Sequence, residues 1–69
     1  MTKTNRIENN MKFVRLSKHK TLDELFLETK IWQARLSRIE RGIFAPRPEE
    51  KRKIARALDS KIVTVFPES

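Results

Sequence analysis

The chain has 69 residues, which is enough for one domain with a small core, and it contains no cysteine. The lack of cysteine excludes a disulfide framework and a thiolate metal site. Sixteen lysines and arginines against nine acids give a formal net charge of +7, which favours a polyanionic partner: nucleic acid, an acidic protein or an anionic membrane surface.

The first predicted helix runs from about Arg6 to Ser17. Its apolar stripe consists of Ile7, Met11 and Val14. Residues 1–5 are expected to form a flexible tail. The connection that follows holds a lone histidine, His19, which we expect to be solvated and not a metal ligand.

The second predicted helix begins at a capping box. The Thr21 hydroxyl can accept from the Glu24 amide, while the Glu24 side chain can reach back to the start of the helix. The expected inner stripe consists of Leu22, Leu25, Phe26 and Thr29. We expect the helix to end near Thr29.

The third predicted helix begins at residue 32 or 33 and ends at Gly42, a residue type common just beyond helix ends. Its apolar stripe is expected to anchor it to the core, and comprises Trp32, Leu36 and Ile39. The opposite side carries two cations and no acid, and comprises Ala34, Ser37, Arg38 and Arg41. Two short helices joined by about three residues, the second with a basic outer side, indicate a helix-turn-helix that offers this side to nucleic acid.

A fourth helix is predicted to begin at Pro48, because proline suits the first helical turn, and to end at Asp59-Ser60. The last segment, Ile62–Phe66, fits one face of a short helix but also has the β-branched content of a strand. We favour a helix that ends at Pro67. The expected fold class is therefore all-α with five helices.

These motifs occur in a fixed order along the chain. They are Thr21-x-x-Glu24-Leu25, Thr29-x-Ile31-x-Gln33, Ser37-Arg38-Ile39-Glu40-Arg41-Gly42, Pro46, Ile54-Ala55-x-Ala57-Leu58 and Phe66-Pro67-Glu68. In this order they resemble the phage repressor and Cro-like helix-turn-helix family, also called the XRE family. The resemblance implies a compact, lambda-repressor-like domain of five helices over residues 6–69, with the helix-turn-helix at helices 2 and 3. It also implies sequence-specific binding to double-stranded DNA, usually as a homodimer.

The resemblance assigns roles to residues, and side-chain chemistry agrees with several of them. The family's base-reading positions fall on Gln33, Ala34 and Arg38. Phosphate contacts are expected from Thr21, Leu22, Lys30, Trp32, Arg35, Arg41 and Arg47. The resemblance also implies a largely buried ion pair between Arg15 and Glu40, and the helical period independently places Glu40 beside the apolar stripe of the third helix.

Some residues depart from the family pattern. Lys30 replaces the glycine of the turn and must adopt either a right-handed or a mildly strained left-handed conformation. Trp32 replaces a capping serine or threonine. Its indole either completes the apolar stripe of the helix or lies on the sugar–phosphate edge of the DNA. Phe26 replaces an alanine, Leu22 a glutamine, and Lys20 an apolar residue.

The expected function is that of a cytoplasmic DNA-binding transcriptional regulator, a repressor, whose third helix enters the major groove. No catalytic constellation, cofactor or small-molecule ligand is indicated, and no apolar run approaches the ~20 residues of a membrane span. The alternative is an antitoxin-like or adaptor module that binds a protein, with DNA secondary. Phe13, Leu16 and Phe44 keep this alternative open, although we expect Phe13 and Leu16 to pack against flanking segments. The Phe44 loop and Ile62–Phe66 are the expected dimer surface.

Overall fold

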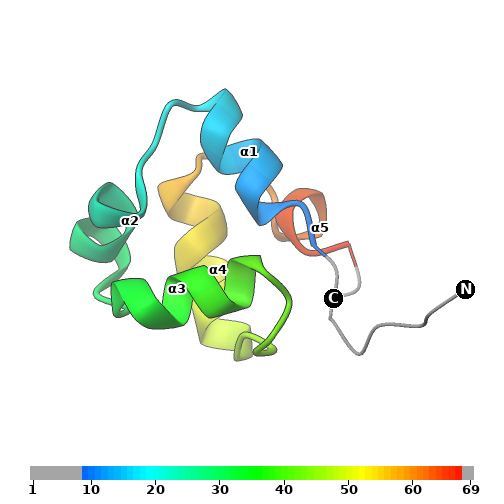
Figure 1. Cartoon of the computed structure of the whole chain (residues 1–69). Coiled ribbons are helices and arrows are strands. Elements are labelled where there is room, and N and C mark those ends of the chain that lie inside the picture. Colours follow the sequence, from blue (N-terminus) through cyan, green and yellow to red (C-terminus); the bar gives the residue numbers. More distant parts are fainter. Residues whose placement is uncertain (1–8, 68–69) are drawn as a thin grey trace, which may run out of the picture.

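A computed structural model describes residues 9–67 of the chain, and all its regular structure is helical (Figure 1). The five helices are α1 (Met11–Ser17), α2 (Leu22–Thr29), α3 (Gln33–Glu40), α4 (Pro48–Ala57) and α5 (Ile62–Val65). The predicted all-α, five-helix fold is confirmed, including the choice of a helix for the last segment. The predicted tail, residues 1–5, lies outside the described residues.

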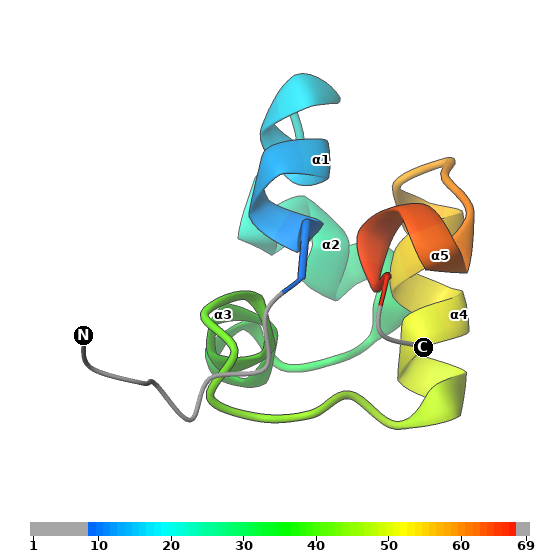
Figure 2. The ribbon, with the colours of Figure 1, turned by 90° about the vertical axis from the view of Figure 1, so that its right-hand side faces the viewer.

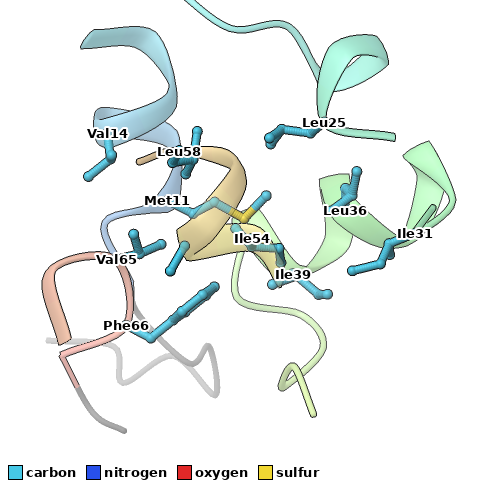
Figure 3. Close-up of a cluster of buried hydrophobic side chains, with 11 residues drawn as sticks. Met11, Val14, Leu25, Ile31, Leu36, Ile39, Ile54, Leu58, Val65 and Phe66 are labelled. Atoms are coloured by element: carbon cyan, nitrogen blue, oxygen red, sulfur yellow. The ribbon is translucent and has the colours of Figure 1, made fainter. Parts of the chain in front are cut away.

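The helices surround one small core (Figure 3). Every helix contributes to it, and its buried apolar residues are Met11, Val14, Leu25, Ile31, Leu36, Ile39, Ile54, Ala55, Leu58, Val65 and Phe66. Leu36 and Ile39 are fully buried, so the inner stripe of α3 holds this helix against α2 and the rest of the core. Two views at right angles place α3 at one edge of the molecule, below α1 in both views (Figures 1 and 2). This arrangement leaves one whole side of α3 outside the core.

The predicted start of the first helix is wrong. The helix begins at Met11, and Asn9 and Asn10 before it are not helical. The Asn9 side chain accepts a hydrogen bond from the Met11 amide at 2.9 Å and donates one to the Ile39 carbonyl at 2.9 Å. The Asn10 amide donates to the Val65 carbonyl at 2.8 Å. These contacts with α3 and α5 replace the hydrogen bonds of a longer helix.

The expected packing of Phe13 and Leu16 is also wrong, since 76% and 53% of their surfaces are exposed in the described fold. Met11 and Val14 occupy the inner side of α1, so that residues 13 and 16 face outward. The expected dimer surface needs revision for a related reason. Val65 and Phe66 are buried in the core of the monomer, and within Ile62–Phe66 the exposed large side chain is Val63.

Helices α1, α3 and α4 end in the same type of turn, with a left-handed residue after the helix. In α3 this residue is Gly42, whose φ is 79°, and the Ile43 amide closes the turn by donating to the Arg38 carbonyl at 2.8 Å. The prediction that Gly42 terminates the helix is therefore confirmed. The corresponding residues after α1 and α4 are His19 and Asp59, with φ of 58° and 52°.

Lys30 ends α2 in a left-handed conformation, with a φ of 64°. Of the two conformations that the sequence left open, Lys30 therefore adopts the left-handed one. This conformation costs a residue with a Cβ atom about 1–2 kcal/mol.

We expect Lys30→Gly to raise the free energy of unfolding by about 1 kcal/mol, after allowing for the extra entropy of glycine in the unfolded chain. Thermal denaturation would measure this as a rise in Tm. Lys30→Ala is the matched control: it removes the same charge but keeps the Cβ atom, and an equal rise in Tm for both variants would refute the strain.

Candidate nucleic-acid interface

The outer side of α3 is exposed and polar. Gln33, Ala34 and Arg38 are all exposed on it, and Arg41 follows as the exposed residue that caps the helix. The structure thus brings the three predicted base-reading residues together on one side of a helix that is anchored from the opposite side by Leu36 and Ile39. A helix presented in this way has the shape that the major groove of B-DNA admits.

Gln33 is held by the helix that precedes it. Its amide nitrogen donates a hydrogen bond to a carboxylate oxygen of Asp23 in α2. An amide side chain has two N–H donors and one carbonyl acceptor. With one N–H bound by Asp23, a donor and an acceptor remain, which is the pair that adenine N7 and N6 require. Asp23 therefore acts as a positioning residue for Gln33.

Arg38 packs on an aromatic ring and has no carboxylate partner among residues 9–67. The centre of its guanidinium lies 5.7 Å from the centroid of the Phe44 ring, and Arg35 lies at 5.5 Å from the same ring. Cation–π contacts of this kind orient a guanidinium without using its hydrogen-bond donors. Within residues 9–67 no acceptor binds the guanidinium donors of Arg38, which can therefore bind a base edge.

Arg35, predicted to contact phosphate, is held in an ion pair with Glu50 of α4. Its Nε donates to Glu50 Oε2 at 2.6 Å and its Nη2 donates to Glu50 Oε1 at 2.8 Å. The Arg47 amide also donates to Glu50 Oε1, at 2.7 Å. The charge of Arg35 is thus already compensated, and its bidentate contact fixes α3 against the start of α4.

These contacts also set the charge state of Glu50. The hydrogen bonds from Arg35 lower the pKa of the Glu50 carboxyl below its ordinary value of 4.5, against the opposing effect of burial. A carboxyl whose pKa is lower in the folded state contributes stability above its unfolded pKa and loses it as the pH falls through the folded pKa.

We expect Glu50→Gln to lower Tm by a few degrees at pH 7, because the amide cannot form the ion pair with Arg35. This difference from the parent should shrink as the pH falls below about 4.5, the ordinary pKa of the carboxyl in the unfolded chain, and through its lower pKa in the folded state. Thermal denaturation of both proteins between pH 3 and pH 7 measures it. A difference in Tm that does not vary with pH would contradict a role for the charge.

Arg15 and Glu40 form a second bidentate pair, between α1 and the last residue of α3. Arg15 Nε donates to Glu40 Oε2 at 2.7 Å, and Nη2 donates to Oε1 at 3.3 Å. Arg15 Nη1 also donates to the Lys20 carbonyl at 2.8 Å. The side chains are only 11% and 8% exposed. Glu40 borders the inner side of α3, roughly opposite Arg38, so the pair ties the end of α3 to α1.

Trp32 does not complete the apolar stripe of α3, because 73% of its surface is exposed. Its backbone precedes the helix with ψ of 142°, so Trp32 does not follow the helical period that places Leu36 in the core. The indole stacks on Phe26 of α2 instead, with ring centroids 5.3 Å apart and planes inclined by 16°. The buried member of this segment is the neighbouring Ile31.

The other predicted phosphate contacts lie around α3. Lys30, Arg41 and Arg47 are exposed. At the start of α2 the capping box is present: the Glu24 amide donates to the Thr21 hydroxyl at 3.1 Å, and the Thr21 amide donates to Glu24 Oε1 at 2.8 Å. The latter bond lowers the pKa of the Glu24 carboxyl. Because the Thr21 amide is occupied, the backbone donor left for a phosphate is that of Leu22 or its neighbour.

Four residues contact the interface side chains in ways that the sequence did not predict: Asp23, Phe26, Phe44 and Glu50. Each acts through a residue from another helix or loop, so periodicity within one helix could not identify it. The sequence feature that could have identified Glu50 was its position in the first turn of a helix, close to arginines with no acidic partner of their own. Phe44 was recognisable only as a bulky apolar residue in a loop.

The fold and the exposed side of α3 define a helix-turn-helix domain. The chain matches the family model described as "Helix-turn-helix" over residues 11–65. It therefore belongs to this family of XRE-type, Cro-like proteins, as the motifs predicted, and its role is that of a DNA-binding transcriptional regulator. No curated protein matches the chain. No helix among residues 9–67 is long and apolar enough to cross a membrane.

Proposed function

We propose that this regulator is a sequence-specific repressor that inserts α3 into the major groove of its operator. The observation that carries the proposal is the outer side of α3, where Gln33, Ala34 and Arg38 are exposed together and two of them are oriented by neighbouring side chains. Orientation before binding reduces the entropy lost when side chains contact bases. With α3 in the groove, the protein would cover promoter DNA and exclude the transcription machinery.

The three side chains suit different base edges. Arg38 can donate two hydrogen bonds to guanine O6 and N7, while Gln33 can pair with adenine N6 and N7. Ala34 is small enough to let the helix approach the floor of the groove. Lys30, Arg41 and Arg47 are placed to contact phosphates on either side, which would fix the register of α3 without reading sequence.

We also propose that the protein binds as a homodimer, with half-sites about one helical turn apart. The exposed side chains that favour this arrangement are Ile43 and Phe44 in the loop after α3 and Val63 in α5, which are 51%, 40% and 59% exposed. The end of α3 and α5 lie on the same side of the molecule (Figures 1 and 2). A two-fold axis beside this surface would set two α3 helices side by side.

Selection of bound sites from random duplex DNA tests the proposal. The expected result is a two-fold-related consensus that contains guanine and adenine in each half-site. Half-site spacing reports the dimer in the same experiment. Enrichment without a consensus, together with a strong dependence of affinity on salt, would instead indicate binding through phosphates alone. Failure to bind DNA would favour the protein-interaction alternative.

A further inference from the structure

Trp32 is a large apolar side chain that the fold exposes at the start of α3. The indole stacks on Phe26 of α2, but 73% of the surface of Trp32 remains exposed. The stack holds the indole in one orientation, because parallel rings 5.3 Å apart restrict rotation of both side chains. The result is a rigid apolar platform built from the two helices of the helix-turn-helix.

Apart from the stack on Phe26, this position offers a tryptophan little that would stabilise the protein. The residue before a helix is usually one whose side-chain oxygen accepts a hydrogen bond from a backbone amide, and tryptophan has no such oxygen. The structure accordingly has no side-chain cap at the start of α3. The indole also remains in contact with water in the unbound protein. Both features point to a function of this side chain in a complex.

The surroundings of Trp32 define what it would contact. On one side it adjoins Gln33, the first proposed base-reading residue. It also borders a surface hollow with a mixed but mainly basic lining, which includes Lys30, Arg35, Arg47, Lys53, Glu49 and Glu50. With α3 inserted as proposed, a side chain between Gln33 and the exposed cations Lys30 and Arg47 would lie at the edge of the major groove. The apolar group that a base presents there is the C5-methyl of thymine.

We propose that Trp32 is a specificity-determining residue that contacts the C5-methyl group of a thymine at the outer edge of each half-site. This inference rests on the proposed insertion of α3 into the major groove. The contact would bury apolar surface on both partners, and it would favour thymine over cytosine, which lacks the methyl group. It adds one base pair to those read by Gln33, Ala34 and Arg38.

Replacement of single thymines by deoxyuridine in the selected site tests the contact, because it removes the methyl group and leaves base pairing unchanged. Burial of one methyl-sized group corresponds to roughly a fourfold change in affinity. We expect one thymine per half-site at which deoxyuridine weakens binding by the parent protein by about this factor. For Trp32→Ala, the same replacement should change affinity by less than twofold, since the side chain that senses the methyl is absent.

Two further variants separate recognition from stability. Trp32→Phe keeps an aromatic platform on Phe26 and should retain the preference for thymine over deoxyuridine. Trp32→Ser supplies the missing cap but removes the stack on Phe26, two opposing effects of similar size, so we expect a Tm within a few degrees of the parent and loss of the preference for thymine. A purely structural role for the indole instead predicts that Trp32→Ser keeps the parental preference for thymine.

Fluorescence gives an independent measurement, because Trp32 is the only tryptophan of the chain. Binding to the selected duplex should protect its emission from an added quencher, and the deoxyuridine duplex should protect it less. If deoxyuridine weakens the parent and Trp32→Ala equally at every position, or if the consensus has no thymine at its outer edge, the inference fails while the proposed function stands. If selection yields no consensus, the proposed function fails first, and the inference with it.

Discussion

Glu40→Ala is expected to lower the free energy of unfolding by about 3–5 kcal/mol, because it leaves the Arg15 guanidinium largely buried without its carboxylate partner. Arg15 and Glu40 are only 11% and 8% exposed, and their two hydrogen bonds join α1 to the last residue of α3. A domain of this size has a net stability near the lower end of the usual 5–15 kcal/mol, so a large fraction of molecules would be unfolded. Thermal or urea denaturation measures the loss.

The same variant should change DNA affinity little once the unfolded fraction is taken into account, because Glu40 lies on the side of α3 opposite Arg38. Titration of DNA at low temperature, corrected for the folded fraction measured by circular dichroism, tests this. The double variant Arg15→Met/Glu40→Leu removes both charges and fills similar volume, and we expect it to recover most of the stability.

The matched control for this ion pair is Glu28→Ala. Glu28 pairs with Lys20 at 2.6 Å, but its side chain is 42% exposed. Exposed pairs contribute about 0–1 kcal/mol, so the control should lie close to the parent. Equal melting temperatures for Glu40→Ala and Glu28→Ala would show that the buried pair is not important for stability.

The fold was predictable from the sequence wherever the cause of a structure is local. The capping box of Thr21 and Glu24, the proline at the start of α4 and Gly42 at the end of α3 each act within a few residues, and the corresponding helix ends were correctly predicted. The start of α1 was wrong because it depends on contacts of Asn9 and Asn10 with α3 and α5, which are distant in sequence.

The environment of the interface was less predictable, for the same physical reason. The side chain of Arg35 had the type and position of a phosphate contact, but its partner is Glu50, fifteen residues further along the chain. The orientation of Trp32 was undecided between core and surface, because a residue just before a helix does not follow the helical period. Its non-helical backbone and its stack on Phe26 resolve that choice.

Arg38→Ala is expected to relax the preference for one guanine in each half-site and to weaken binding to the selected site by about 1–3 kcal/mol per half-site, or roughly 5- to 150-fold. The reason is the loss of two hydrogen bonds to one base. The fold should be unaffected, because Arg38 is exposed and has no ion-pair partner among the described residues. Repeating the selection with the variant identifies the position that it reads.

Arg41→Ala is the matched control, since it removes the same charge from the exposed end of α3 at a position proposed to contact phosphate. It should weaken binding to all sequences to a similar extent and reduce the salt dependence of the affinity, with an unchanged consensus.

Phe44→Leu should weaken the preference for the same guanine as Arg38→Ala, but less, because it removes only the ring on which Arg38 packs. If selection with Arg38→Ala recovers the parental consensus, Arg38 does not read a base, and Gln33 and Ala34 remain the candidate base-reading residues.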